Sequence, residues 1–486
     1  MATDSTSTFT ALRPRALAVP RVATGWFVAA GVLVIAALSL LLPSAPTYDP
    51  WSWIIWGREI TGLDLNTVDG PSWKPLPVVF TTVFALFGDA SAPDLWLLVA
   101  RTGALAGVVA AFALVRRLGG GVAGATVAAA ALAFAPWTVR NAALGNSEGL
   151  MVACVLGAVE RHLAGRRGQA FALAVGAGLL RPEAWPFLGL YAAWLVWHDR
   201  SRLLQAALGL ALIPLLWFPP ELWGSGNLMR ASDRAKEPNP NSPAFADSPS
   251  LAVLRLANEM MTVPMWIGLA ALLAAAVWQR RRPGAVAGLV VLAVAWLGLV
   301  ALMTERGFSG NQRYLIVPVA LAFVAAGTGL GRLASTLGGR LSFPRAVPAA
   351  VCAAALVGLA VVTFATQRET ARLPNVLSAV AYQARLSDDL GTAVAQAGGR
   401  GALRRATCGD VYTSAFLVPT VAWHLHRHAE DIGLHPAGSG LVLLARLTPR
   451  SRVGPILDGV GGEPAVSTLA ASDRWRIVRA CPGGAA

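Results

Sequence analysis

The acidic residue best placed for chemistry is Asp49, which directly follows the first apolar stretch of the chain. Trp51, Trp53 and Trp56 come next, so the carboxylate is expected in a partly desolvated pocket. Burial raises the pKa of a carboxyl group toward the range in which a general base works. We therefore interpret Asp49 as a candidate base. A helix-capping Asp within an interfacial belt of tryptophans is the simpler alternative.

The other candidates are charged or aromatic residues at the borders of apolar stretches. Lys74 is a lone cation that could bind an anion such as a lipid phosphate at the headgroup level, with ordinary snorkelling as the alternative. Charges at membrane depth are costly and usually functional, although each could instead form a structural ion pair. The full set of candidate substrate-binding residues is Asp69, Lys74, Arg140, Glu148, Arg181, Glu183, Arg313 and Tyr314.

The elements that position these residues are predicted to be membrane helices. The chain has 486 residues, 55% hydrophobic and only 14% charged, whereas soluble proteins carry about a quarter charged residues. Such a chain needs the bilayer as its solvent. About eleven spans are predicted, at residues 24–43, 93–115, 121–137, 149–163, 168–181, 184–198, 203–220, 262–279, 284–303, 313–331 and 346–366. The stretch 75–88 is too short to span and is interpreted as a helix along the outer interface.

The distribution of charge predicts the topology. The formal net charge is +14, and the basic clusters fall in alternate loops that share a side with the N-terminal arginines. The positive-inside rule then places residues 1–23 in the cytoplasm as a tail, with a cleaved signal peptide as the rival interpretation. An odd number of spans puts the C-terminus outside a cell membrane, on the side where most acids fall. A nucleic-acid partner is not expected, because no long basic face is present.

The predicted domains are a transmembrane domain at 24–366, with a first outer loop at 44–92, and a C-terminal domain at 367–486. The C-terminal segment has ordinary charge, alternating stretches at Gly440–Leu447 and Trp475–Cys481, and a helical stretch near 373–397, which together predict a small soluble α/β domain. Cys408 and Cys481 are a disulfide candidate if this domain lies outside the cytoplasm. No metal site is expected from the sequence.

In this context the chain resembles the GT-C superfamily of polytopic membrane glycosyltransferases, over roughly residues 24–331. Members carry an essential acid in the first outer loop, which Asp49 matches. Many have a second acid next to it, where this chain has Pro50, so the resemblance does not fix the donor sugar. The other matching motifs are Lys74-Pro75-Leu76-Pro77, Leu86-Phe87-Gly88, Arg116-Arg117, Ser147-Glu148, Arg181-Pro182-Glu183 and Arg313-Tyr314-Leu315 with Pro318.

The resemblance implies transfer of a sugar from a polyprenyl-phosphate donor to a glycan, glycolipid or protein acceptor of the cell envelope. Asp49 would deprotonate the acceptor hydroxyl, with inversion at the sugar, and Lys74, Arg181 or Arg313 would offset the charge of the leaving lipid phosphate. The resemblance leaves the use of a divalent cation open. The high Ala, Gly and Arg content is similar to that of actinobacterial proteins.

Two alternatives remain at this stage. A polytopic transporter or lipid flippase predicts charged residues near the middle of the membrane rather than at one edge. A non-catalytic scaffold with a GT-C-like fold predicts that Asp49 opens onto no cavity large enough for a sugar.

Overall fold

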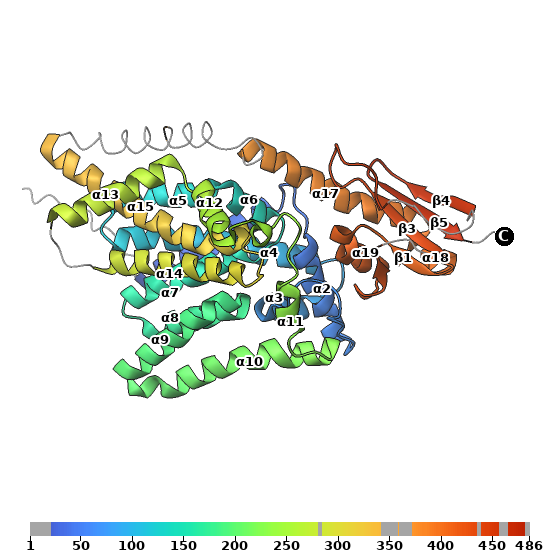
Figure 1. Ribbon diagram of the computed structural model, residues 1–486, viewed down its shortest axis with the longest axis horizontal. Coiled ribbons are helices and arrows are strands. Elements are labelled where there is room, and N and C mark those ends of the chain that lie inside the picture. Colours follow the sequence, from blue (N-terminus) through green and yellow to red (C-terminus); the bar gives the residue numbers. More distant parts are fainter. Residues whose placement is uncertain are drawn as a thin grey trace, which may run out of the picture.

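The computed structural model describes residues 21–279, 284–341, 358, 372–434, 439–455 and 465–481. A helical part is followed along the chain by a small sheet domain at one end of the molecule (Figure 1). The predicted span 346–366, apart from position 358, and most of the predicted tail 1–23 lie outside the described residues. The helices of the first part are α1 (Arg21–Ser39), α2 (Tyr48–Thr61), α3 (Pro75–Ala85), α4 (Ala92–Arg117), α5 (Gly121–Phe134), α6 (Pro136–Ala143), α7 (Glu148–Leu163), α8 (Arg167–Leu180), η1 (Pro182–Ala184), α9 (Trp185–His198), η2 (Arg200–Arg202), α10 (Leu203–Ser225), α11 (Arg230–Ala235), η3 (Pro243–Phe245), α12 (Pro249–Met260), α13 (Val263–Gln279), α14 (Ala285–Glu305) and α15 (Gln312–Leu341).

The apolar stretches of the sequence coincide with helices wherever the structure describes them. Among the described residues, four helices are long and apolar enough to cross a membrane, or up to six if each bent helix pair forms one span. The four are α4, α14, α15 and α10, the last extended by η2. The predicted count of about eleven spans is therefore not confirmed. The short stretch predicted to lie along the interface is α3.

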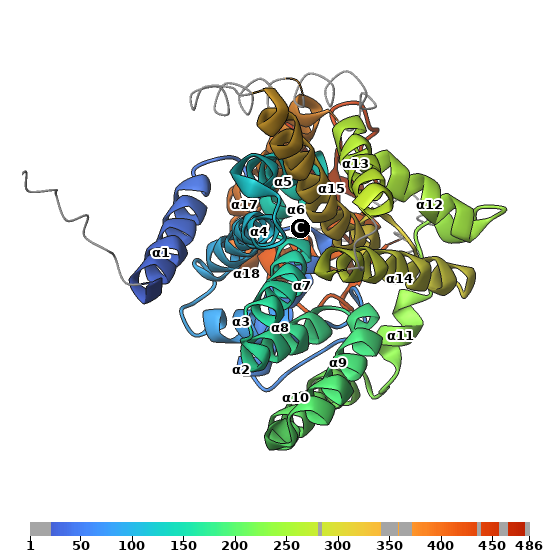
Figure 2. The same ribbon diagram turned by 90° about the vertical axis from the view of Figure 1, so that its left-hand side faces the viewer.

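Small residues let the central helices approach closely. A Cβ atom on Gly124 of α5 would lie 2.2 Å from the carbonyl oxygen of Gly327 in α15, so only glycine fits there. In the same way, a Cβ atom on Gly149 of α7 would lie 2.7 Å from the backbone nitrogen of Ala104 in α4. Such contacts between small residues are typical of helix packing in membranes. The contact of Gly149 fixes the start of α7, where Glu148 lies, and the contact of Gly124 holds the middle of α15. Helix α1 packs on α4 at the edge of the bundle (Figure 2).

The C-terminal part is an α/β domain, as predicted. Its elements are α17 (Leu373–Gln396), α18 (Gly399–Ala406), β1 (Asp410–Tyr412), η5 (Ala415–Leu417), α19 (Val418–Leu425), β2 (Ile432–Gly433), β3 (Gly440–Ala445), β4 (Ala465–Ala471) and β5 (Trp475–Cys481). The strand order is β2-β1-β3-β5-β4. Strand β1 runs parallel to β2 and β3, while β5 runs antiparallel to β3 and β4. Cys408 and Cys481, the predicted disulfide candidates, are bonded, with their Cα atoms 6.1 Å apart.

The C-terminal domain contacts the segment between α1 and α4 of the helical part. Helix α19 packs against α2, and the two lie side by side in Figure 1. Polar contacts reinforce this packing: Arg58 donates a hydrogen bond of 3.2 Å to the carbonyl of Arg427, and His428 Nδ1 lies 2.7 Å from Glu59 Oε1. The segment that carries Asp49 is thus held between the helical bundle and the sheet domain.

Candidate active site

Asp49 lies in the first turn of α2, where a carboxylate is stabilised by the helix dipole. The start of α2 is tied to the loop before α7, because the backbone N–H of Thr47 donates to the carbonyl of Leu144 at 3.2 Å. This contact brings Asp49 to the same place as Glu148, the first residue of α7. The Asp49 side chain is largely buried, with 16% of its surface exposed.

Arg313, in the first turn of α15, bridges the two carboxylates. Its Nη1 atom lies 2.8 Å from Asp49 Oδ2, and its Nε atom donates to Glu148 Oε1 at 2.7 Å. Arg181 Nη2 donates to the same Glu148 oxygen at 2.6 Å. Glu148 is almost fully buried, so these charge-assisted bonds replace the water that it has lost. Residues from α2, α7, α15 and the end of α8 therefore meet in one ion network.

Arg181 occupies an extended conformation where α8 ends, and Pro182 begins the following 3-10 turn. Its guanidinium carbon lies 4.6 Å from the ring centroid of Tyr314, a cation–π contact. Its Nη1 atom also lies 3.4 Å from Glu183 Oε1. The Arg-Pro-Glu turn thus supplies a buried cation to the network and a carboxylate that pairs with it.

Lys74 completes the network from the start of α3. Its Nζ atom lies 3.8 Å from Asp49 Oδ2 and 5.0 Å from the centroid of the Trp53 ring. Burial, together with the positive charges of Arg181 and Arg313, lowers the pKa of Lys74 from its usual 10.5 to about 7. This ammonium group is therefore poised to gain or lose its proton near neutral pH.

The pKa of Asp49 differs from the expectation. Burial by itself raises this pKa, as predicted from the surrounding tryptophans, but the charges of Arg313 and Lys74 outweigh burial and hold the pKa of Asp49 below its usual value. The predicted upward shift is therefore wrong. The sequence indicated the aromatic surroundings but not the two cations, which come from other segments.

Two predicted candidates lie away from this network. Asp69 is exposed and lines a separate polar cavity. Arg140 is exposed at the end of α6, and no side-chain contact ties it to the described part of the network. Their substrate-binding roles stay predictions. The other named candidates, Lys74, Glu148, Arg181, Glu183, Arg313 and Tyr314, all meet around Asp49.

Sequence reasoning missed several residues that lie outside the network. Arg230, Asp233 and Arg234 belong to α11 and line the same polar cavity as Asp69. The sequence did offer a signal for them, because the segment between the apolar stretches 203–220 and 262–279 carries charges of both signs. Glu59 and His428 were also missed, because the contact between them joins two segments that are far apart in the chain.

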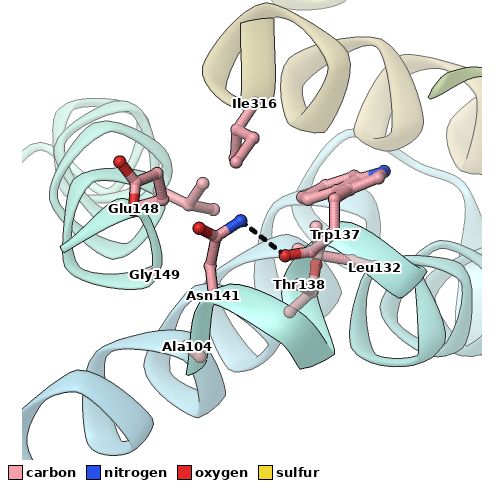
Figure 3. Close-up of a pocket in the computed structure, with 9 residues that line it drawn as sticks. Ala104, Leu132, Trp137, Thr138, Asn141, Glu148, Gly149 and Ile316 are labelled. Atoms are coloured by element: carbon pink, nitrogen blue, oxygen red, sulfur yellow. Dashed lines mark hydrogen bonds between the residues drawn. The ribbon is translucent and has the colours of Figure 1, made fainter. Parts of the chain in front are cut away.

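One small cavity adjoins the network, and a larger one lies among the neighbouring helices. A cavity of about 10 Å³ lies beside Glu148 and is lined by Asn141 and Trp137, whose carbonyl accepts a hydrogen bond of 2.7 Å from the Asn141 side chain (Figure 3). It has room for about one water molecule. A much larger apolar cavity of about 520 Å³ lies between α7, α8, α9 and α14, and its lining includes Ala184.

The network does not form a metal site. Within the described ranges, no three His, Cys, Asp or Glu side chains come together as ligands would. The two carboxylates at the centre, Asp49 and Glu148, are each paired with cationic side chains. This donor set does not suit a divalent cation.

Comparison with known proteins gives a structural match. No protein-family model matches the chain, and no curated protein matches its sequence. The fold is similar to that of ArnT from Cupriavidus metallidurans bound to undecaprenyl phosphate, with a TM-score of 0.52 and 15% identity over 95% of this chain and 100% of that chain. The apo form of ArnT gives a TM-score of 0.53 and 18% identity with the same coverage. The chain therefore has an ArnT-like fold.

Proposed function

We propose that this chain is a membrane glycosyltransferase that moves a sugar from a polyprenyl-phosphate donor to an acceptor on the outer face of the cell membrane. The observation that carries the proposal is the ion network of Asp49, Lys74, Glu148, Arg181 and Arg313, assembled from separate segments at helix ends. The undecaprenyl phosphate bound to ArnT, a protein of the same fold, supports a lipid-phosphate donor.

In this proposal the cations of the network bind the donor phosphate. Two guanidinium nitrogens, Arg181 Nε and Arg313 Nη2, are buried without a hydrogen-bond partner among the described residues. Buried donors normally have partners, so these nitrogens are suited to phosphate oxygens of the substrate. Arginine also matches phosphate geometry through paired hydrogen bonds. When Lys74 is protonated, its ammonium group adds a further positive charge for the phosphate.

Donor binding would also activate Asp49. Arg313 and Lys74 hold the pKa of Asp49 low, and a phosphate that competes for both cations weakens that effect, so the carboxylate becomes a better base. Asp49 then takes the proton of the acceptor hydroxyl. The acceptor oxygen forms its bond to the anomeric carbon from the face opposite the phosphate, the bond from that carbon to the phosphate oxygen breaks, and polyprenyl phosphate leaves with inversion at the sugar.

The apolar cavity of about 520 Å³ is placed to hold the isoprenoid tail. Ala184 in its lining directly follows Glu183, which pairs with Arg181 of the network. A lipid whose phosphate lies at Arg181 and Arg313 can therefore extend its tail along α7, α9 and α14. The lining is aromatic and aliphatic, including Phe187, Tyr191 and Trp296, as such a chain requires.

A transporter or flippase is less favoured, because the charged groups lie at the ends of α2, α7, α8 and α15 rather than in their middle turns. A non-catalytic scaffold stays an alternative to this proposal. Asp49 itself lines neither the apolar cavity nor the polar cavity at Asp69, as a scaffold predicts, although Tyr48, the residue before it, lines the polar one.

The donor site is tested by binding of undecaprenyl phosphate to the full chain in lipid nanodiscs, measured by native mass spectrometry. Arg313→Gln removes one charged partner of the phosphate, and such bonds contribute about 1.5–3 kcal/mol, so we expect binding to weaken roughly 10- to 100-fold. Arg306→Gln is the matched control, since Arg306 is an exposed arginine at the end of α14. Equal affinity in both variants would overturn the donor site.

A further inference from the structure

A second cavity, of about 450 Å³, lies between the helical part and the C-terminal domain and is called here the outer polar cavity. One wall comes from the first outer loop at Tyr48, Val68, Asp69 and Gly70, and another from Asn227 and the α11 segment up to Glu237. The third wall is the C-terminal domain, through Ala415, Val418, Ile432 and Leu434. Its volume falls within the range of about 300–1,000 Å³ that small-molecule sites occupy.

The lining of the outer polar cavity offers donors and acceptors together. Three carboxylates, from Asp69, Asp233 and Glu237, face two guanidinium groups, from Arg230 and Arg234. The two arginines are held by main-chain oxygens: Arg230 Nη2 donates to the carbonyl of Gly70 at 3.1 Å, and Arg234 Nε donates to the same carbonyl at 3.2 Å.

Asp69 is the group that remains free for a ligand. It is exposed, and within the described part of the chain no hydrogen bond or ion pair holds its carboxylate. A carboxylate that is free to accept, beside an aromatic ring and an apolar wall, suits the hydroxyls and the carbon face of a sugar. The three carboxylates disfavour a phosphate or another anion, and the polar walls disfavour a lipid tail.

The cavity also lies next to the candidate base. Tyr48 lines it, and the Cα atom of Asp49 is about 3.8 Å further along the chain. The cavity therefore adjoins the first turn of α2, which carries the candidate base. The apolar cavity proposed for the donor tail is lined by residues of α7, α8, α9 and α14, so the two cavities share no lining residue.

We propose that the outer polar cavity binds the acceptor, that the acceptor is a neutral carbohydrate, and that the C-terminal domain forms one wall of its site. The role of the bound carbohydrate as an acceptor rests on the proposed glycosyltransferase function. The binding of a carbohydrate in this cavity does not depend on that function. It gives the C-terminal domain a role that the sequence left open.

The experiment measures saturation-transfer NMR signals of three neutral disaccharides, maltose, mannobiose and arabinobiose, with the full chain in lipid nanodiscs and no donor present. Ala415→Trp fills the cavity from an exposed position of the C-terminal domain, and Asp69→Ala removes the free carboxylate. Asp247→Ala is the matched control, because Asp247 is an exposed acid between η3 and α12 that does not line the cavity.

At least one disaccharide is expected to give a saturation-transfer signal with the unmodified chain and with Asp247→Ala. The signal of that disaccharide is expected to be at least five-fold weaker with Ala415→Trp and with Asp69→Ala. No signal from any of the three sugars, or equal signals in all variants, would overturn the inference. Binding of inorganic phosphate in place of the sugars, seen by ³¹P line broadening, would overturn it as well.

Failure of the proposed function would look different. The chain would then bind no undecaprenyl phosphate, while the disaccharide signal and its loss in Ala415→Trp would remain. If instead only the carbohydrate inference failed, undecaprenyl phosphate would still bind to the chain and to Ala415→Trp. The disaccharides would then give no signal, or the same signal in every variant.

Discussion

At the scale of single residues, Lys74 makes donor binding sensitive to pH. Burial and the nearby arginines lower its pKa to about 7, so its positive charge is lost as the pH rises above that value. Between about pH 7.5 and 9 undecaprenyl phosphate, a phosphate monoester, is already ionised, because the second pKa of such a group lies near 6. We therefore predict that the Kd for undecaprenyl phosphate rises with pH across this window, by up to about tenfold per unit.

The matched variant is Lys74→Arg, because arginine keeps its charge at every pH of the experiment. We expect its Kd to be nearly flat from pH 7.5 to 9. A slope as steep as that of the unmodified chain would show that another group is responsible.

Glu148 is the counter-charge for Arg181, which is buried, and for Arg313, which is half-buried, and its removal leaves both poorly compensated. Breaking a buried ion pair from one side costs about 3–5 kcal/mol. We predict that Glu148→Gln lowers the thermal unfolding temperature of the chain in nanodiscs. Glu237→Gln is the control, because its ion pair with Arg234 is at the surface. Equal stability of both variants would contradict a central role for Glu148.

Sequence reasoning identified most residues of the network but not their pairing. Glu148, Arg181 and Arg313 stand out because each is a charge at the border of an apolar stretch. Which carboxylate each arginine binds depends on how α7, α8 and α15 cross, and no local pattern encodes that crossing. Because no local pattern places Arg313 and Lys74 beside Asp49, the pKa of Asp49 was predicted to shift in the wrong direction.

At the scale of elements, the contact between α2 and the C-terminal domain is expected to loosen as the pH rises. Burial raises the pKa of Glu59 to about 7. Burial lowers the pKa of His428, but its hydrogen bond to Glu59 and the charges of Glu59 and Asp64 raise it more. Both folded-state values lie above the unfolded ones, so both contributions to stability are present at low pH and are lost as pH rises through them.

We predict faster hydrogen exchange of α2 amides, and of the adjoining α19, at pH 8 than at pH 6 after correction for intrinsic exchange. His428→Ala should remove part of this difference by raising exchange at pH 6. An unchanged difference between the two pH values in His428→Ala would show that the contact does not depend on this pair.

Element boundaries were predicted well where apolar length was the signal. Helices α4 and α14 match predicted stretches to within about two residues, because the bilayer requires long apolar runs. Helix α15 begins near its predicted start but continues to Leu341, well beyond the predicted end at 331. Helices α6, α11 and α12 were not predicted, since they are short and carry mixed polar residues. Two of them, α6 and α12, adjoin bends of 53° and 100° that only packing against neighbouring helices determines.

At the scale of the whole molecule, the Cys408–Cys481 disulfide closes a long loop across the C-terminal domain, with a sequence separation of 73. A loop of this size contributes about 4 kcal/mol by restricting the unfolded chain. We predict that Cys408→Ser with Cys481→Ser lowers the unfolding temperature of the domain and increases its proteolysis. Cys154→Ser, at a buried free cysteine of α7, controls for the loss of a thiol. Unchanged proteolysis of the double variant would contradict this.

The division into a helical part and an α/β domain was predictable because the two parts have different composition. The parallel and antiparallel strand order of the sheet was not, since it depends on contacts between distant segments such as β1 and β3. The outer polar cavity was equally hidden, because its walls come from the first outer loop, the α11 segment and the C-terminal domain. Only the assembled molecule brings them together.

The measurement that tests the central claim most directly is sugar transfer by Asp49→Asn. Radiolabelled sugar on undecaprenyl phosphate is supplied to the full chain in nanodiscs, with cell-envelope extract of the source organism as acceptor, and Asp94→Asn, at an exposed acid in the first turn of α4, serves as control. A general base contributes about 10²- to 10⁴-fold to the rate. We predict a loss of that size in Asp49→Asn, with undecaprenyl phosphate still bound and Asp94→Asn unaffected. Full transfer activity in Asp49→Asn would contradict the assignment of Asp49 as the base.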